Sequence, residues 1–227
     1  MSDNASKNHD RRGFLQSGLA GTAGVGLAIA STTSVAIAES EAAPKSPEVS
    51  NDVDVLVVGG GTAGVVAAIQ AARAGAKTLI IERGSQLGGT GTTGGVAFPG
   101  LFDAWGKQVI AGIGWELVKE SVELDQGELP NFAKVPQRHW QNQIYTNQFL
   151  YSILAEEKCA EAGVEIAYYE FPQSVVKVEN GWQLECAGFG TKRTVTCKQI
   201  IDCTGGAEVV GMLGFERMRE EERQPGS

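Results

Sequence analysis

The chain has 227 residues, of which 42% are hydrophobic, and a formal net charge of −8 at pH 7. This length predicts one domain, or one domain with a small attachment, with enough apolar residues for a sizeable core. The acidic balance, with no basic cluster beyond the N-terminus, argues against nucleic-acid binding. The four cysteines include no C-x-x-C pair, so zinc, iron–sulfur and thioredoxin-like sites are not predicted, and no metal is expected.

The first 38 residues are predicted to be a signal peptide. Asp10-Arg11-Arg12-Gly13-Phe14-Leu15 resembles a twin-arginine motif, with Asp10 where a serine or threonine is common. A weakly apolar run over residues 15–35 leads to Ala36-Ile37-Ala38, which matches an A-x-A cleavage site. The run is too rich in glycine and polar residues for a transmembrane helix. We therefore expect the twin-arginine export machinery to carry the chain to the periplasm or outside the cell, with no stable membrane span after cleavage.

Two points about this N-terminal region stay open in the sequence. An uncleaved anchor or a disordered tail is the alternative to a cleaved signal. Residues 39–52, which contain Pro44 and Pro47 among polar side chains, are expected to form a linker.

Residues 53–82 carry the main motif of the chain. The short apolar run of residues 53–58 predicts a buried parallel strand, and the alanine-rich, proline-free residues 62–74 predict a helix. Residues 78–81 predict a second strand, with Glu82 at its end. Between the first strand and the helix lies G-x-G-x-x-G, formed by Gly59, Gly61 and Gly64.

Each part of this motif has a physical task in binding a dinucleotide. Gly59 allows the tight turn, Gly61 lets a pyrophosphate approach the backbone, and Gly64 lets helix and strand pack closely. The free amides and the positive dipole end of the helix face the phosphates. Glu82 follows Gly59 by 82 − 59 = 23 residues, close to the spacing of about 20 at which a carboxylate takes a ribose hydroxyl. An ordinary βαβ unit with a glycine-rich turn is the alternative.

A second glycine-rich loop follows at residues 83–96. It holds six glycines and four hydroxyl residues in fourteen positions, so its backbone can bend around a ligand and donate N–H groups. A flexible linker has a similar composition. The position of the loop directly after the strand that ends at Glu82 favours a cofactor loop.

The remaining segments alternate between helices and strands. Helices are predicted over residues 110–123 and 147–162, and a third sheet strand begins at residues 164–166. Three further strands form a predicted β meander, and a last apolar strand ends in a glycine pair. These four segments are Ser174–Val178, Trp182–Cys186, Arg193–Thr196 and residues 199–206.

Some residues of the chain have two interpretations. Six aromatic residues between the second glycine-rich loop and the second long helix could line a substrate cavity, although aromatic side chains more often belong to the core. They are Phe98, Phe102, Trp105, Trp115, Phe132 and Trp140. His139 is a weak candidate for an acid–base group, since a lone histidine in a loop is more often incidental. Export would permit a disulfide between Cys186 and Cys197, but buried free thiols are the favoured state.

Several motifs together resemble the N-terminal half of FAD-dependent oxidoreductases of the glutathione-reductase-like class. They are G-G-G-T-A-G, I-E-R-G and L-G-G-T-G-T-T-G-G-V, followed by a strand that resembles the family signature h-h-D-A-T-G. Thr204 of that strand lies 204 − 59 = 145 residues after Gly59. Cys203 replaces the usual alanine. Gly206 stands where the family has an acid, and Glu208 is at the second acidic position.

The resemblance covers most of residues 53–227 and implies FAD rather than NAD as the cofactor. It implies a three-layer α/β, Rossmann-like FAD-binding domain over these residues, with a β meander and a partly helical insertion. In such a domain Glu82 holds the adenosine ribose, the second glycine loop approaches the pyrophosphate or flavin, and backbone near Ser174 and Val175 faces the adenine. The cofactor-binding residues that the motifs and the resemblance imply are Gly59, Gly61, Thr62, Ala63, Gly64, Glu82, Arg83, Gly88, Gly89, Thr90, Ser174, Val175, Thr204, Gly205 and Glu208.

The expected function is that of an exported FAD-dependent oxidoreductase. It would pass two electrons, as a hydride, between flavin and an unidentified small-molecule substrate, with an electron acceptor or donor as a further partner. Proteins of the resembled family run on for a further domain-sized stretch. The alternative is therefore a truncated or non-catalytic nucleotide-binding module that needs a missing C-terminal half or a partner chain. An NAD-dependent dehydrogenase is a second rival, disfavoured by the second glycine loop and the final strand.

Overall fold

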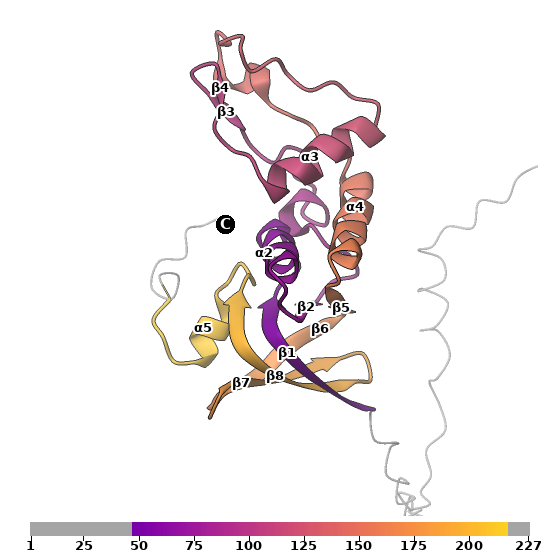
Figure 1. The fold of residues 1–227 in the computed structure, drawn as a ribbon, viewed down its shortest axis with the longest axis vertical. Coiled ribbons are helices and arrows are strands. Elements are labelled where there is room, and N and C mark those ends of the chain that lie inside the picture. The colour runs from indigo at the N-terminus through magenta and orange to yellow at the C-terminus, as the bar shows by residue number, and fades with distance from the viewer. Residues whose placement is uncertain (1–46, 218–227) are drawn as a thin grey trace, which may run out of the picture. The chain divides into compact units, whose positions relative to one another are not determined.

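The computed structural model describes residues 47–217 (Figure 1). The predicted signal peptide of residues 1–38 and its cleavage site lie outside the described residues, so both stay predictions. Among residues 47–217, no helix is both long and apolar enough to cross a membrane. Within the same part of the chain, no group of three or more His, Cys, Asp and Glu side chains could hold a metal ion.

A twisted sheet of six strands, in the order β5-β2-β1-β8-β7-β6, forms the centre of the fold. β1 is parallel to both β2 and β8, and β2 is parallel to β5. β6, β7 and β8 pair antiparallel as a meander. The strands are β1 (Glu48–Val58), β2 (Thr78–Glu82), β5 (Glu165–Tyr168), β6 (Glu170–Val178), β7 (Gly181–Gly188) and β8 (Lys192–Asp202).

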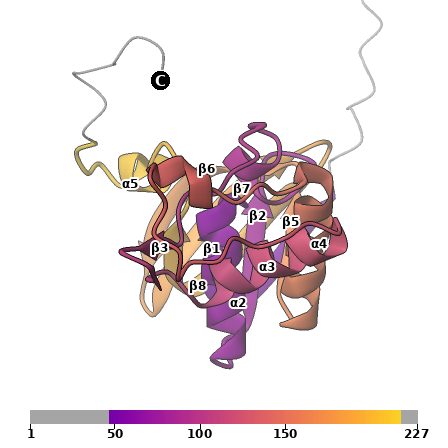
Figure 2. The same cartoon turned by 90° about the horizontal axis from the view of Figure 1, so that it is seen from above.

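Two helices, α2 (Thr62–Arg73) and α4 (Gln148–Glu161), lie along one face of this sheet. A third, α3 (Ile113–Leu124), packs on α2 and α4 on their side away from the sheet (Figures 1 and 2). The short helices are η1 (Gly89–Gly91), η2 (His139–Asn142) and α5 (Glu208–Met212). A small hairpin of β3 (Asp103–Ala104) and β4 (Lys107–Gln108) belongs to the segment between β2 and α4.

Alternating side chains of the central strands bury two separate apolar clusters. Val57 and Ile80 face α2, α3 and α4, where Val65, Ile69 and Leu154 are almost fully buried. The opposite face packs against the meander; its members include Leu56, Leu79, Leu184, Val195 and Cys197. A strand that is buried on both faces has an almost continuous run of apolar residues in its sequence. Residues 53–58 therefore contain almost no polar side chain. Helices, parallel strands and meander thus form three layers, and the predicted fold class is confirmed.

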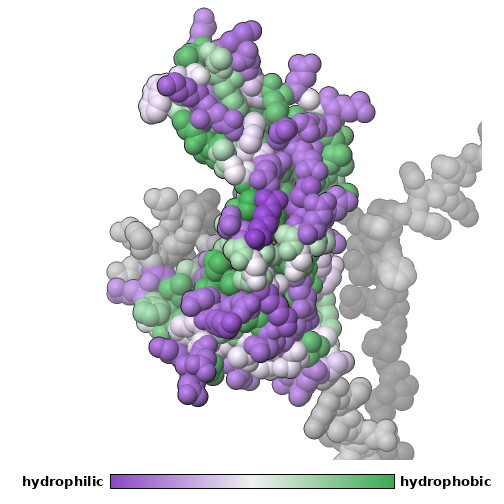
Figure 3. Space-filling model, viewed as in Figure 1, coloured by the Kyte–Doolittle hydropathy of each residue, from purple (hydrophilic) through white to green (hydrophobic). Residues whose placement is uncertain are grey.

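The insertion between β2 and α4 is partly helical, as predicted. Phe102, Trp115 and Phe132 form a chain of ring contacts with centroids 5.1 and 5.6 Å apart, and they join the cluster beneath α3. The outer side of the insertion leaves apolar side chains exposed, including Trp105 with 90% of its surface accessible. Apolar side chains are visible on this upper part of the molecule in Figure 3.

Two predicted boundaries were wrong. The linker ends before Glu48, because Glu48 to Asp52 pair with Lys192 to Thr196 of β8. These polar residues have low strand propensity, but the long partner strand supplies hydrogen bonds that override it. The two segments that were predicted as the third meander strand and the final strand form a single strand, β8, because the residues between them also pair with β1.

The predicted preference for free thiols is confirmed, since all four cysteines are free. Cys186 pairs across the ladder with Arg193, whereas Cys197 pairs with Trp182. The two cysteines are therefore offset along neighbouring strands, and the disulfide alternative is not supported.

Candidate functional site

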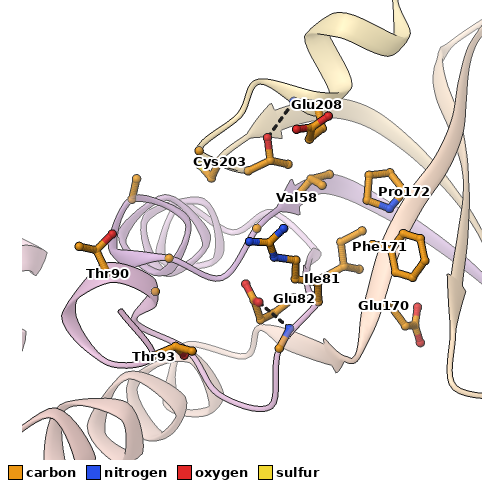
Figure 4. Close-up of a pocket in the computed structure, with 18 of the residues that line it drawn as sticks. Val58, Ile81, Glu82, Thr90, Thr93, Glu170, Phe171, Pro172, Cys203 and Glu208 are labelled. Atoms are coloured by element: carbon orange, nitrogen blue, oxygen red, sulfur yellow. Dashed lines mark hydrogen bonds between the residues drawn. The ribbon is translucent and has the colours of Figure 1, made fainter. Parts of the chain in front are cut away.

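A cavity of about 930 Å³ lies where the carboxyl ends of β1, β2 and β8 meet. This volume is at the upper end of the range for small-molecule sites. Figure 4 shows Thr90 and Thr93 at one end of the cavity and Phe171 and Pro172 at the other, with Glu82 between them. Ligands of open parallel sheets bind at this edge, where the strands leave for opposite directions.

Most of the predicted cofactor residues line this cavity. Those that do so are Gly59, Gly61, Thr62, Ala63, Glu82, Arg83, Gly89, Thr90, Thr204, Gly205 and Glu208. They come from segments more than 100 residues apart in sequence, and β1 brings them together because it pairs with both β2 and β8. The remaining four, Gly64, Gly88, Ser174 and Val175, do not line it.

The amino end of α2 points its first backbone amides at the cavity. Gly61 is the N-cap residue, and no side chain caps the helix. Thr62 and Ala63, the first residues of the helix, line the cavity. Uncapped amides and the positive end of the helix dipole form an anion site, so a phosphate group would replace the missing cap.

Glycines in and beside the cavity wall let the surrounding backbone segments lie close together. A Cβ atom at Gly64 would lie 1.9 Å from the carbonyl oxygen of Gly59, so α2 can approach the end of β1 only without a side chain there. A Cβ atom at Gly89 would lie 2.7 Å from Cα of Gly61. The Gly88 amide donates to the Gly60 carbonyl at 2.8 Å. The two glycine loops therefore meet backbone to backbone.

Glu82 joins both loops through its carboxylate. Its Oε2 accepts a hydrogen bond from the Gly60 amide at 2.6 Å, and its Oε1 accepts one from the Gly84 amide at 2.6 Å. Each carboxylate oxygen has two acceptor positions, so each retains one for a ribose hydroxyl. The motif does not specify the residue at position 60, and no sequence signal distinguished the role of its amide.

A hydrogen-bond network fixes the end of β8. Asp202 accepts hydrogen bonds from the Thr204 amide and hydroxyl through Oδ1, at 3.0 and 2.7 Å. Its Oδ2 accepts from the Val210 amide at 3.0 Å, and the Glu208 amide donates to the Thr204 hydroxyl at 2.9 Å. Thr204 is thus held at the cavity wall.

The Cys203 side chain also lines the cavity, where the resembled signature has alanine. Burial, together with the nearby Asp202 charge, raises the pKa of the Cys203 thiol. The thiol therefore stays protonated at neutral pH and contributes apolar surface to the wall.

The far wall of the cavity is formed by residues that precede Ser174 and Val175 on β6, and the contact of those two with an adenine stays a prediction. Glu170, Phe171 and Pro172 of β6 line it, whereas Ser174 pairs with Glu185 and Val175 belongs to the core beneath the meander. The pairing of β6 with β7 is irregular between Pro172 and Ser174, an offset that alternation of side chains cannot indicate.

A buried ion pair stands behind this wall. The Arg193 guanidinium donates to both carboxylate oxygens of Glu170, at 2.6 and 2.9 Å, and also to the side chain of Asn51. The hydrogen bond to Glu170 raises the pKa of Arg193, so the guanidinium stays charged.

The residues of the aromatic set do not line the cavity. The aromatic set is divided: Phe102, Trp115 and Phe132 pack with the core, while Trp105, Trp140 and Phe98 are exposed. His139 lies in η2, and its catalytic role stays a prediction.

The arrangement is suited to a long ligand with phosphates near its middle. The uncapped start of α2 and the second-loop residues Gly89 and Thr90 line the cavity, and the Glu82 carboxylate is available for a sugar. Gly59, Gly61 and Gly89 line the cavity without side chains, so a pyrophosphate can lie against the backbone there. These residues fit a dinucleotide cofactor.

Sequence comparison places the chain among flavoproteins. The family model "FAD dependent oxidoreductase" matches residues 54–225. A thiamine thiazole synthase from Methanococcus vannielii is 32% identical over 170 residues, which are 71% of this chain and 60% of that protein. A pseudooxynicotine dehydrogenase from a Pseudomonas species is 42% identical over 82 residues, 35% of this chain and 16% of that protein. The chain thus spans less than two thirds of the length of these relatives.

Solved structures with the same fold agree with this placement. A geranylgeranyl bacteriochlorophyll reductase-like protein from Thermoplasma acidophilum has a TM-score of 0.52 at 19% identity, covering 74% of this chain and 43% of that one. The anhydrotetracycline hydroxylase OxyS from Streptomyces rimosus has a TM-score of 0.51 at 20% identity, covering 72% and 34%. At this identity the likeness concerns the fold alone. From the family match, the chain belongs to the FAD dependent oxidoreductase family, and its cofactor is FAD.

Proposed function

We propose that this chain binds FAD along the cavity and serves an oxidoreductase that moves two electrons to or from a small-molecule substrate. The observation that carries the proposal is the meeting of two glycine loops at the uncapped start of α2, between Glu82 and Thr204. When bound, FAD supplies a flavin ring that accepts or donates a hydride. An electron acceptor or donor is the further partner that such a reaction needs.

The residues of the cavity have separate tasks in this proposal. The α2 amides and the second glycine loop hold the pyrophosphate. Glu82 accepts the ribose hydroxyls, and Phe171 with Pro172 closes the end that receives the adenine. The Thr204 end of β8 keeps the opposite wall in place. Together these groups bind and orient the cofactor, and none of them needs to move a proton.

A module that binds FAD without turnover is the second proposal. The matched part covers 60% of the first relative, and in this proposal further polypeptide supplies the substrate side. The relatives' names describe different reactions, so they do not select a substrate. Turnover of a reducing substrate with a dye acceptor would distinguish an active enzyme from such a module.

Export by the twin-arginine route forms the third part of the proposal. That route carries folded proteins, which suits a flavoprotein that acquires its cofactor in the cytoplasm. Replacing Arg11 and Arg12 with lysine should retain the precursor inside the cell, as immunoblots of periplasmic and cytoplasmic fractions would show. Equal export of the variant would contradict this route.

The absorbance spectrum of the purified protein tests the cofactor proposal directly. Oxidised flavin bands, with FAD released by acid, are the expected result. A colourless protein that also fails to bind added FAD would contradict it. Added NAD serves as the control ligand, and protection from unfolding by NAD instead of FAD would favour a nicotinamide enzyme.

A further inference from the structure

Arg193 of β8 lies at the centre of a polar network that also includes residues of β1, β5 and β6. Its guanidinium donates to both carboxylate oxygens of Glu170 on β6, at 2.6 and 2.9 Å. It also donates to the Asn51 side chain on β1 and lies 3.8 Å from the Glu165 carboxylate on β5. Asn51 in turn donates to Glu165 at 3.0 Å. The Arg193 and Glu170 side chains are 13% and 7% exposed, so this pair is little screened by water and salt.

The chain makes a sharp corner directly before Glu170. β5 ends at Tyr168 and β6 begins at Glu170, although these two strands lie at opposite ends of the sheet order. Tyr169 alone joins them, with a φ of 59°, in the left-handed region that residues with a side chain rarely adopt. Its amide donates to the Gly84 carbonyl at 3.2 Å. The corner is thus tied to the second glycine loop.

The backbone ladder is weak where β6 reaches the cavity. Pro172 has no amide hydrogen to donate, and the pairing of β6 with β7 shifts between Pro172 and Ser174. Neighbouring side chains of a strand point to opposite faces. Glu170 is accordingly buried against Arg193, whereas Phe171 is 46% exposed and lines the cavity (Figure 4). Fixing the carboxylate on one face therefore helps to fix the aromatic ring on the other.

We propose that Arg193 is a positioning residue for the base of the cofactor, acting through Glu170 on Phe171. The inference rests on the proposed binding of FAD, in which Phe171 and Pro172 close the adenine end of the cavity. Arg193 does not line the cavity, and Glu170 is the member of its network that does, so the effect on a ligand passes through Glu170. A purine covers more of an aromatic ring than a pyrimidine does. The preference for adenine over a pyrimidine base should therefore depend on Arg193.

The test replaces the ion pair without leaving a buried charge unpaired. In the full chain freed of cofactor, Glu170→Leu combined with Arg193→Met puts apolar side chains in place of the pair, a change that need not lower stability. Titration should show ADP affinity lowered about 3- to 10-fold, the range for one misplaced aromatic contact, and UDP affinity lowered by less than about twofold. Both nucleotides carry the same ribose and diphosphate, so their affinity ratio reports on the base alone.

Two single variants complete the comparison. Arg73→Met is the matched control, because it removes the ion pair of Arg73 with Glu116 at 2.9 Å, and neither residue lines the cavity. Both nucleotide affinities should stay unchanged in it. Arg193→Lys keeps a charge beside Glu170 but cannot form the two-pronged contact. The ADP-to-UDP preference should fall in this variant too, which tests the geometry if the double variant folds poorly.

A mutant cycle separates positioning from a general loosening of the fold. Phe171→Ala removes the ring through which the effect should act. In that background, replacing the Glu170–Arg193 pair should cause no further loss of the ADP-to-UDP preference. A general loosening would instead lower the affinities for both nucleotides, with or without the ring.

The positioning role and the proposed function fail by different results. An unchanged ADP-to-UDP preference in the ion-pair variant, equal losses for both nucleotides, or effects additive with Phe171→Ala would overturn the positioning role alone. The same holds for a wild-type chain that binds FAD but does not prefer ADP to UDP. A wild-type chain that binds neither FAD nor ADP would overturn the proposed function as well. A loss confined to ADP, and absent after Phe171→Ala, would establish the role.

Discussion

One added methyl group at Gly64 tests the close approach of α2 to the end of β1. In Gly64→Ala the Cβ atom would lie 1.9 Å from the Gly59 carbonyl oxygen, whereas ordinary contact begins at 3.4 Å. The helix must therefore move by about 3.4 − 1.9 = 1.5 Å, although its residues Val65 and Ile69 are fully buried in the cluster between the helices and the sheet. The clashing atom belongs to the backbone, so we take the upper end, about 3 kcal/mol, of the cost of overpacking.

Alanine also favours a helix by about 1 kcal/mol relative to glycine. The net loss in Gly64→Ala should then be about 2 kcal/mol, or about 4–8 °C in Tm for a domain of this size. FAD affinity should fall as well, because the displaced helix carries the amides that face the pyrophosphate. Urea denaturation and FAD titration measure the two effects.

Gly114→Ala provides the matched control for this substitution. Gly114 is also near the start of a helix, α3, but a Cβ atom there meets nothing within 4 Å. The same substitution should stabilise the protein by about 0.4–1 kcal/mol and leave FAD binding unchanged. A Gly64→Ala variant as stable as Gly114→Ala would refute the reasoning.

Four further predictions concern the cavity wall and the core. Cys203 should be the first cysteine to react with iodoacetamide, and FAD should slow that reaction, as peptide mass spectrometry would show; equal labelling with and without FAD would contradict its place in the cavity. Glu82→Gln should weaken FAD binding about tenfold, because a charge-assisted hydrogen bond to ribose becomes a neutral one, and unchanged fluorescence titrations would exclude that contact. Arg193→Met should lower the free energy of unfolding by about 3–5 kcal/mol, since it leaves the buried Glu170 carboxylate without its partner; urea denaturation measures the loss, and a fall below 1 kcal/mol would contradict it. Stability should also fall as pH rises above about 8.5, where unfolded thiols ionise, because burial keeps three folded thiols protonated to higher pH. The three thiols are those of Cys159 and Cys186, each with a pKa raised to about 12, and of Cys197, with a pKa raised to about 11. Urea titrations at pH 8 and 10.5 should show a smaller fall in the free energy of unfolding when any one of these cysteines is replaced by alanine.

The cavity parts made of backbone could be predicted from sequence. A loop that must approach another loop or a phosphate closely requires glycine, which is visible in the sequence. A helix whose first amides must stay free for a ligand has no capping side chain before it. The residues of the first motif and Gly89 were found for this reason. Ser174 and Val175 were named from the family resemblance instead, and neither lines the cavity, where Phe171 and Pro172 of the same strand lie.

Contacts between distant segments left no such sequence signal. The amide of Gly60 holds Glu82, but backbone amides are present at almost every position. The early start of β1 was missed because its first residues are polar, and only the length of β8 opposite them explains their pairing.

That missed end of β1 bears on the Phe171 side of the cavity. Asn51 lies in it and accepts a hydrogen bond from Arg193, whose guanidinium also holds Glu170 at the wall. A buried ion pair adds little net stability, yet a bidentate pair fixes geometry. The strand before the nucleotide-binding motif thus helps to set where Phe171 stands, 120 residues beyond Asn51 (171 − 51 = 120). Shortening β1 from its amino end should therefore weaken FAD binding even though every motif glycine is kept.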